Sequence, residues 1–367
     1  MAGLIVHEWI ARSGGSENVL EAMSKTYPSA DIYCLWNDAP GRFPAHKVRE
    51  SALAKTPLRK SKAAALPFMP PVWAQVSLDS YDWTLVSSHL FAHHVGTPSS
   101  RAKQKIHVYV HTPARYIWTP ELDRRGQNPV TRLVAPYFRQ LDKRRAADGA
   151  EFAANSEFVR ERIRNTWGQD SRVIYPPVSV TKLQSESNWV DRLNSTDLAQ
   201  IERLPDTYIL GASRFVSYKQ LESVILAGES SGVPVVLAGS GPEEKFLTDL
   251  AEQASVPVFF VNAPSDHLLY ALIQRALVYI FPPIEDFGIL PVEAMALGTP
   301  AIVNHIGGAV ESVLALDGGT SVETFQGPSI SAAIHDAAGK DMSKAKQRAR
   351  VFSEESFSDK ISAWIGS

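Results

Sequence analysis

Residues 281–300 read FPPIEDFGILPVEAMALGTP, and their first residue, Phe281, ends an apolar run that starts at Val278. The run predicts a buried strand, and Glu285-Asp286-Phe287-Gly288 predicts a turn. A helix is expected from about Leu290, with Pro291 at an early helical position where its missing N–H costs nothing. A glycine-containing turn before a helix leaves backbone N–H groups without partners, so this segment predicts an anion-binding site.

Two glutamates, Glu285 and Glu293, flank this turn eight residues apart, one at its mouth and one expected inside the first turn of the helix. Carboxylates repel a neighbouring phosphate, so we expect them to accept hydrogen bonds from neutral hydroxyls of a sugar or a ribose. The alternative is that they only complement the helix dipole. That alternative accounts for Glu293 but not for the whole segment.

Two cations follow another apolar run, 208–211. Arg214 and Lys219 lie five residues apart at an expected strand-to-helix junction. This placement suits neutralisation of a diphosphate leaving group.

Glycines open two further loops. Gly14 and Gly15 follow the first apolar run and open a helix, where glycine lets the backbone approach a phosphate, although the G-x-G-x-x-G spacing is absent. The segment 239–242, GSGP, is interpreted as a structural turn, with ligand contact as the alternative.

Short apolar runs alternate with longer amphipathic segments along all 367 residues. Such runs are typical of strands buried on both faces of a parallel sheet, and their alternation predicts an α/β architecture. The length exceeds the roughly 250–300 residues that one core serves, so two domains are expected. The expected strands are 3–7, 30–35, 83–87, 105–110 and 151–155 in the first half, and 208–211, 234–238, 256–261, 278–281 and 300–304 in the second.

A boundary is expected near 175–178, YPPV, followed by the polar stretch 184–188, QSESN, whose composition is typical of a linker. Open α/β sheets bind ligands at the carboxyl ends of their strands. The cleft between the two domains is therefore the expected site.

Charge is unevenly distributed although the formal net charge is only -2. Through Val180 there are 24 Lys+Arg and 16 Asp+Glu, a net of +8, and from Thr181 onward 13 and 23, a net of -10. The overall balance excludes a general polyanion binder, so no nucleic-acid partner is expected. The basic half either meets an anionic partner or is merely solvated. Segment 59–73 adds Phe68 and Trp73 to three cations, which suits a membrane interface, with an ordinary helix and loop packed inward as the alternative.

Cys34 is the sole cysteine, so an intramolecular disulfide is excluded and a reducing cytoplasm is favoured. His7 and Glu8 interrupt the first apolar stretch, and no window approaches the roughly 18 apolar residues of a membrane span. A soluble or peripheral protein is expected.

Three histidines, His89, His93 and His94, have no carboxylate at metal-ligand spacing in the sequence. His107 and His111 lie four apart on an expected strand running into a loop, where that spacing does not bring them together. No metal site is expected.

In these motifs the chain resembles the retaining GT-B glycosyltransferases of family 4. Glu285-x7-Glu293 is similar to their E-x7-E signature, and Arg214 with Lys219 is similar to their diphosphate-binding pair. The resemblance spans essentially the whole chain.

Two N-terminal segments extend the resemblance. The loop GGSE at 14–17 is similar to the family's glycine loop, with Ser16 where alanine is common. The segment HTPARY at 111–116 resembles the H-T-P-x-R-Y segment of a mannosyltransferase-like subgroup.

The resemblance implies a GT-B fold of two Rossmann-like parallel-sheet domains facing a central cleft. It implies an acceptor-binding domain over 1–178, on which a C-terminal helix within 352–367 packs back, and a donor-binding domain over 179–351. The glycines at 14 and 15 join the donor site in this interpretation.

The resemblance also implies residue roles. Glu285 is expected to contact donor-sugar hydroxyls and Glu293 the ribose, while Arg214 and Lys219 stabilise the departing diphosphate in place of a metal. His111 is expected near the reacting sugar. The remaining implied contacts are the backbone amides of Phe287, Gly288 and Ile289 to the donor, and Arg115 and Tyr116 to the acceptor.

The expected reaction is metal-independent and cofactor-free transfer of a hexose, with mannose from GDP-mannose favoured, to a glycan or lipid-linked acceptor. The alternatives are a UDP-sugar transferase for a small or soluble acceptor and a noncatalytic nucleotide-sugar binding protein. A cytoplasmic location is expected. The basic half is expected to attach peripherally to an anionic membrane, the inner face of the plasma membrane.

Overall fold

The computed structural model describes residues 2–120 and 129–366, and the side chains of 129–132 lie outside that description. The chain divides into two compact units, Met1–Pro177 with Glu354–Ser367 (unit 1) and Val178–Ser353 (unit 2). Both boundaries between the units lie within two residues of the domain boundaries expected from the sequence. The polar stretch 184–188 belongs to unit 2 and is not the linker that its composition predicted, because the Gln184 amide donates to Lys346 O at 2.7 Å.

Unit 1 is built on a parallel sheet that, within the described residues, has seven strands in the order β3-β2-β1-β4-β5-β6-β7. The chain fills one side of the sheet from β1 and then crosses to β4, so β1 and β4 form its topological switch point. The strands are β1 (Gly3–His7), β2 (Asp31–Cys34), β3 (Val48–Glu50), β4 (Trp83–Ser88), β5 (Ile106–Val110), β6 (Glu151–Ala154) and β7 (Arg172–Val173).

Helices cover both faces of this sheet, which is why its central strands read as unbroken apolar runs. Leu4 and Val6 of β1 pack in one hydrophobic cluster and Ile5 packs in another. The helices of unit 1 are α1 (Gly15–Thr26), α2 (Lys62–Ala65), α3 (Met69–Ala74), α4 (Pro98–Arg101), α5 (Arg115–Trp118), α6 (Pro129–Ala146), α7 (Glu157–Trp167) and α17 (Glu354–Ile365), with 3-10 turns η1 (Ala45–Lys47), η2 (Ala52–Lys55), η3 (Pro57–Lys60), η4 (Leu66–Phe68) and η5 (Ala92–His94).

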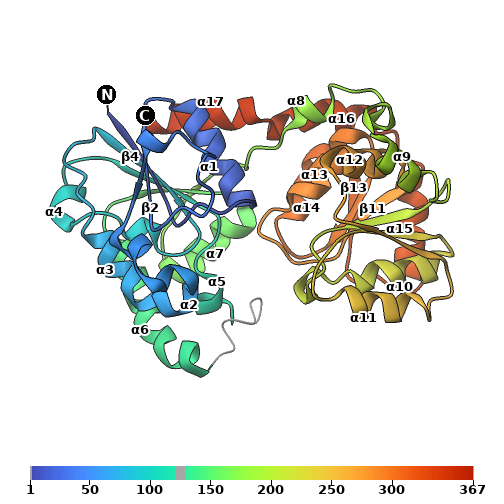
Figure 1. Ribbon diagram of the computed structural model, residues 1–367, viewed down its shortest axis with the longest axis horizontal. Coiled ribbons are helices and arrows are strands. Elements are labelled where there is room, and N and C mark those ends of the chain that lie inside the picture. The colour runs from blue at the N-terminus through green and yellow to red at the C-terminus, as the bar shows by residue number, and fades with distance from the viewer. Residues whose placement is uncertain (1, 121–128, 367) are drawn as a thin grey trace. The chain divides into compact units, whose positions relative to one another are not determined.

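The C-terminal helix α17 returns to unit 1 and lies beside α1 (Figure 1). Phe357, Ile361 and Trp364 recur at helical spacing, are buried, and join the cluster beneath that face of the sheet. Thr26 Oγ1 of α1 donates to Ser358 Oγ at 2.8 Å. The expected closing helix is thus present, starting at Glu354 rather than Phe352.

Unit 2 holds a second parallel sheet, with six strands in its described part in the order β10-β9-β8-β11-β12-β13. Its switch point lies between β8 and β11. The strands are β8 (Ile209–Ala212), β9 (Val235–Gly239), β10 (Val258–Asn262), β11 (Val278–Phe281), β12 (Ala301–Asn304) and β13 (Gly319–Val322). The helices are α8 (Val180–Leu183), α9 (Ser195–Ile201), α10 (Glu222–Ser231), α11 (Glu244–Ala251), α12 (Asp266–Arg275), α13 (Ile289–Leu297), α14 (Ala309–Leu316), α15 (Pro328–Ala338) and α16 (Ser343–Arg348), with 3-10 turns η8 (Trp189–Arg192), η9 (Ser217–Lys219) and η10 (Ala349–Phe352).

Segment 59–73 folds as η3, α2, η4 and α3, and it divides the two aromatics on which the membrane interpretation rested. Trp73 is wholly buried, which fits the alternative of a helix and loop packed inward, whereas Phe68 is half exposed. Among the described residues no helix combines the length and apolarity needed to cross a bilayer.

Candidate functional site

The loops after β8 and β11 meet at the switch point of unit 2, where open α/β sheets bind ligands. The first loop carries Arg214 and Lys219, and the second carries Glu285. The Lys219 ammonium forms an ion pair with the Glu285 carboxylate, so the fold joins two motifs that are 66 residues apart in sequence. Both side chains are largely buried, at 13% and 21% exposed.

The Arg214 side chain is exposed beside the same loop and donates from Nη2 to the hydroxyl of Tyr218 at 2.7 Å. Lys219 Nζ lies 5.4 Å from the centre of the Tyr218 ring and 5.8 Å from that of Phe281. One loop therefore presents two cations, of which Lys219 is fixed by a carboxylate and two aromatic faces.

The turn before α13 is held by the next strand's loop. Gly308 N donates to Glu285 O at 2.8 Å, and a Cβ at Gly308 would lie 2.0 Å from Asp286 O, so only glycine allows this approach. Gly288 has a φ of 84° and precedes α13, which no side chain of the described chain caps. The first N–H groups of α13 are those expected from the sequence to meet an anion.

Phe287 turns its ring inward, where it is buried and packs 5.6 Å from the ring of Phe352. A ligand at this turn would therefore meet the backbone of Phe287, Gly288 and Ile289 rather than the aromatic ring.

Glu293 is the fifth residue of α13, in the second turn and not the first as expected. Burial raises the pKa of its carboxyl to about 7, Asp266 raises it further, and Lys182 opposes both. A carboxylate held out of water in this way gains from hydrogen-bond donors supplied by a ligand.

The glycines of segment 239–242 have a structural reason. A Cβ at Gly239 would lie 1.8 Å from Ser213 O, and one at Gly241 would lie 2.4 Å from Phe215 O. These glycines let the loop after β9 pass close to the backbone of the loop that carries Arg214, which favours the structural interpretation.

In unit 1, the loop at 14–17 is organised around Glu17. Its carboxylate accepts from Ala11 N at 3.2 Å and from Ser16 Oγ at 2.9 Å. A Cβ at Gly14 would lie 2.2 Å from Glu17 Oε2, so the space above this glycine is filled by Glu17. Gly15 begins α1 and is exposed.

His111 directly follows β5, and its Nε2 lies 2.8 Å from Ser87 Oγ of β4. His89, after β4, lies 6.2 Å from His111 and 4.8 Å from Trp9, ring centre to ring centre. Next to them is Glu8, whose buried carboxylate accepts from the N–H groups of Leu90 and Ala92. Burial raises the Glu8 pKa to about 7 against the effect of those hydrogen bonds.

Glu8, His89 and Ser87 were not placed in the functional site from the sequence, although each lies at the carboxyl end of a strand beside the switch point of unit 1. That position in the topology is the signal that finds them. The two residues expected to meet the acceptor, Arg115 and Tyr116, lie half-buried in α5.

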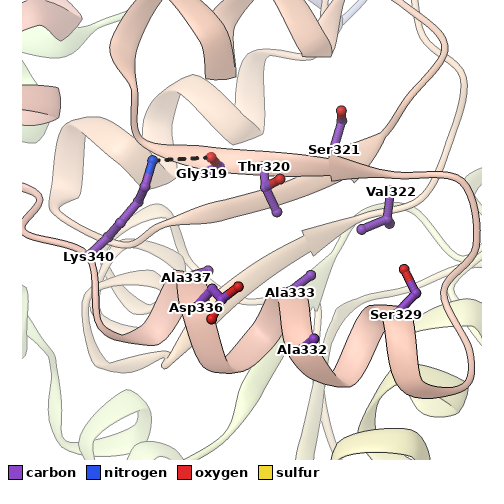
Figure 2. Close-up of a pocket in the computed structure, with 10 residues that line it drawn as sticks. All are labelled: Gly319, Thr320, Ser321, Val322, Ser329, Ala332, Ala333, Asp336, Ala337 and Lys340. Carbon is purple, nitrogen blue, oxygen red and sulfur yellow. Dashed lines mark hydrogen bonds between the residues drawn. The ribbon is translucent and has the colours of Figure 1, made fainter.

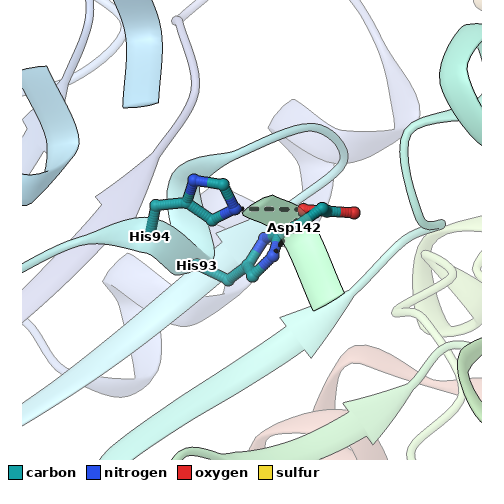
Figure 3. A group of neighbouring side chains, drawn as sticks. All are labelled: His93, His94 and Asp142. Carbon is teal, nitrogen blue, oxygen red and sulfur yellow. Dashed lines mark hydrogen bonds and ion pairs between the residues drawn. The ribbon is translucent and has the colours of Figure 1, made fainter. Parts of the chain in front are cut away.

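His93, His94 and Asp142 form the group of metal-ligating side chains that the described residues bring together (Figure 3). Sequence spacing missed Asp142, because it comes from α6 and reaches the histidines only in the folded chain. Asp142 Oδ1 lies 2.9 Å from His93 Nε2 and 3.0 Å from His94 Nε2.

The other oxygen of Asp142 accepts from the indole N–H of Trp118 at 2.6 Å and of Trp167 at 2.7 Å. Burial by itself raises the Asp142 pKa, but the two histidines bring it well below its usual range. Burial, with His93 second, lowers the pKa of His94 to about 3. These contacts account for the cluster as a buried anchor that ties α5, α6 and α7 to the loop after β4.

A cavity of about 410 Å³ lies between the edge strand β13 and α15 (Figure 2). Lys340 at its end is engaged, donating to Asp317 Oδ1 at 2.7 Å and to Gly319 O at 3.4 Å. The cavity lies two strands away from β11, and none of the predicted site residues lines it.

Comparison with known proteins places two family domains on these units. Residues 13–182 match the model of Glycosyltransferase Family 4, and residues 196–351 match that of Glycosyl transferases group 1. Over its whole length the chain superposes on the crystal structure of Anabaena HepE in complex with UDP, with a TM-score of 0.70 at 16% identity and 100% of each chain covered. The GT-B fold expected from the sequence is thereby confirmed.

Two curated relatives match parts of the chain. An uncharacterized glycosyltransferase of Methanocaldococcus jannaschii, MJ1607, is 30% identical over 158 residues, which are 41% of this chain and 40% of that protein. A GDP-mannose-dependent alpha-(1-6)-phosphatidylinositol monomannoside mannosyltransferase of Mycobacterium tuberculosis is 28% identical over 193 residues, 46% of this chain and 48% of that protein. The chain matches less than half the length of each of these two relatives.

Proposed function

The chain carries a glycosyltransferase family 4 domain followed by a group 1 glycosyltransferase domain, and from this premise we propose that it is a retaining, metal-independent hexosyltransferase. It takes its sugar, mannose, from GDP-mannose and passes it to a hydroxyl of a glycan or lipid-linked acceptor. The observation that carries the proposal is the Lys219–Glu285 ion pair at the switch point of unit 2, beside the uncapped start of α13.

Unit 2 binds the donor in this proposal. The diphosphate lies against Arg214, Lys219 and the first N–H groups of α13, where positive charge and helix dipole favour an anion. Glu285 accepts hydrogen bonds from sugar hydroxyls, and its ion pair with Lys219 holds the carboxylate in place. Glu293 accepts from the ribose.

The reaction forms one bond and breaks one at the anomeric carbon, and it moves one proton. The acceptor oxygen bonds to the anomeric carbon on the face that the diphosphate leaves. The bond between the anomeric carbon and the phosphate oxygen breaks, and the acceptor proton passes to the departing phosphate. Arg214 and Lys219 stabilise the charge that develops on the diphosphate, so their interactions strengthen in the transition state. No side chain serves as a nucleophile in this route.

Unit 1 binds the acceptor, and we assign a lipid-linked acceptor on the strength of its surface. The basic half carries exposed apolar side chains at Phe68 (50%), Leu133 (82%) and Tyr137 (66%). Apolar groups among cations suit the interface of an anionic membrane, which supports a location on the inner face of the plasma membrane. The membrane-bound acceptor and the location are part of the proposal.

Thermal unfolding with nucleotides tests the donor assignment, because a ligand that binds the native state raises the unfolding temperature. GDP should stabilise the protein more than UDP at equal concentration. Stronger protection by UDP would replace GDP-mannose with a UDP-sugar. Binding of a nucleotide sugar without transfer to any acceptor and without its slow hydrolysis would leave a noncatalytic binding protein.

A further inference from the structure

Three polar side chains line up across the carboxyl ends of β1, β4 and β5, which are neighbours in the sheet of unit 1. Ser87 Oγ lies 3.0 Å from Nδ1 of His7 and 2.8 Å from Nε2 of His111. His7 and Ser87 are wholly buried, whereas His111 is half-buried. The serine hydroxyl thus links a histidine inside the sheet to the histidine at the strand end.

Hydrogen counting limits the states of this chain. A serine hydroxyl has one hydrogen and two lone pairs, so Ser87 donates to at most one of the two imidazoles and accepts from the other or from both. Burial lowers the pKa of His7 to about 3, so His7 is neutral and has a single ring N–H. If His7 Nδ1 has no hydrogen, Ser87 donates to it and His111 donates from Nε2. If His7 Nδ1 has the hydrogen, Ser87 accepts from it and either donates to Nε2 of His111 or accepts from it as well.

In each of these hydrogen-bonding states Nε2 of His111 is bonded to Ser87, which restricts rotation of the imidazole. The ring also packs 5.3 Å from that of Tyr109 and 6.2 Å from that of His89, both edge-on. Edge-to-face contacts of this kind restrict the plane of a ring but do not distinguish its two nitrogens. The hydrogen bond to Ser87 does.

We propose that Ser87 is a positioning residue for sugar transfer, which holds His111 with Nε2 toward the sheet and fixes the orientation in which His111 meets the substrate. The inference rests on the proposed function, in which His111 stands near the reacting sugar. Ser87 itself is wholly buried and acts through His111. His7 is the second hydrogen-bond partner of Ser87 and holds its hydroxyl in place.

The next residue on the strand provides a matched control. Ser88 is equally buried, and its Oγ lies 3.2 Å from Nδ1 of His93. Successive side chains of a strand point to opposite faces, so Ser88 makes the same kind of contact away from His111. Ser87→Ala and Ser88→Ala therefore remove the same atoms from the same strand.

The test compares Ser87→Ala, Ser87→Thr, Ser88→Ala, His111→Ala and the Ser87→Ala/His111→Ala double variant by steady-state kinetics with nucleotide-sugar donor and acceptor. Loss of the hydroxyl removes the hydrogen bond that orients Nε2, so Ser87→Ala should lower kcat about tenfold or more with little change in donor KM. Ser87→Thr keeps the hydroxyl and should restore most of kcat. Ser88→Ala should keep the wild-type kcat.

The double variant separates positioning from packing. If Ser87 acts through His111, adding Ser87→Ala to His111→Ala should change kcat less than about twofold, because the interaction energy equals the whole effect of the serine. Nitrogen-15 histidine spectra should show an altered His111 tautomer ratio in Ser87→Ala and an unaltered one in Ser88→Ala. Normal thermal unfolding of each variant confirms that it folds.

The outcomes distinguish the inference from the function on which it rests. Full activity of Ser87→Ala beside a slow His111→Ala overturns the role of Ser87 and leaves the transferase standing. Equal losses from Ser87→Ala with and without His111 also overturn it. Full activity of His111→Ala overturns the role of His111 in the proposed function, and absence of transfer by the wild-type protein overturns that function itself.

Discussion

Lys219 and Glu285 pair at the switch point of unit 2, on loops that follow the adjacent strands β8 and β11. The ammonium of one is the charge expected to meet a diphosphate, and the carboxylate of the other is the acceptor expected to meet a sugar. The ion pair therefore holds the two halves of the proposed donor site in place before any donor binds.

Replacing Lys219 tests the leaving-group role. Lys219→Ala should lower kcat by about 10²-fold or more, because a preorganised donor to developing charge contributes on that order. Lys245→Ala is the matched control, since Lys245 forms an exposed ion pair with Asp249 in α11 and should leave kcat unchanged. Equal activity of the Lys219 variant and the wild type would contradict the assignment.

The two glutamates should separate in binding experiments. Glu285→Gln should abolish most transfer while the free nucleotide still binds within a few-fold of wild type, because Glu285 contacts the sugar. Glu293→Gln should weaken binding of the free nucleotide itself. Calorimetric titration with GDP measures both, and a large loss of GDP affinity in Glu285→Gln would exchange the two roles.

Glu293 also predicts a pH dependence. Its pKa is raised to about 7, so the carboxylate that accepts from the ribose forms only as pH rises through that value. Nucleotide affinity should therefore increase from pH 6 to pH 8, with both limits about one unit from that pKa. Glu293→Gln should remove this increase, which separates it from the titration of Glu8 in unit 1. An unchanged slope in the variant would place the titrating group elsewhere.

The same shift affects stability with a definite sign. A carboxyl whose pKa is higher in the folded state than in the unfolded chain binds more protons when folded. Its stabilising contribution is present below its usual pKa of 4.5 and is lost as pH rises through about 7. Without nucleotide, Glu293→Gln should thus unfold at a higher temperature relative to wild type at pH 8 than at pH 5.

Asp142 should be essential to the stability of unit 1. Asp142→Asn removes the charged acceptor that His93, His94 and two indole N–H groups share, and weakening these buried hydrogen bonds should cost about 1–3 kcal/mol in the free energy of unfolding, measured by denaturant titration. Asp148→Asn removes an acid near the surface, at 32% exposed, that pairs with Arg145 and should cost much less. The anchor interpretation also predicts that a chelator changes neither activity nor unfolding temperature, and a loss of either on chelation would make the cluster a metal site.

The exposed apolar side chains predict salt-sensitive membrane binding. The protein should sediment with vesicles that contain phosphatidylglycerol at low salt, and binding should weaken at high salt as screening removes the electrostatic attraction. A Leu133→Ser/Tyr137→Ser variant should bind less at both salt levels. Failure of the wild type to sediment at low salt would remove the membrane from the proposal.

The central strands were predictable because both faces of each sheet are covered, so strands such as β1 and β11 read as apolar runs. Strands β3, β7 and β13 were not expected, and each lies at the edge of its sheet. Arg49 and Glu50 of β3 are exposed, and β13 reads Gly-Thr-Ser-Val. Edge strands bury less, and so their sequences lack the pattern that marks a buried strand.

The candidate site followed the same division. The positions of Lys219 and Glu285 after strands were predictable individually. Their ion pair requires β8 and β11 to be neighbours in the sheet, which does not follow from the order of the strands along the chain. Asp142 was missed for a related reason: its partners come from the loop after β4, and only the packing of α6 joins them.

The most direct measurement of the central claim is transfer from GDP-mannose to an acceptor, with the anomeric configuration of the product assigned by NMR, for the wild type and Lys219→Ala in parallel. The proposal predicts a product of the same configuration as the donor from the wild-type protein and at least a hundredfold slower formation by the variant. An inverted product, or equal rates from the two proteins, would contradict it.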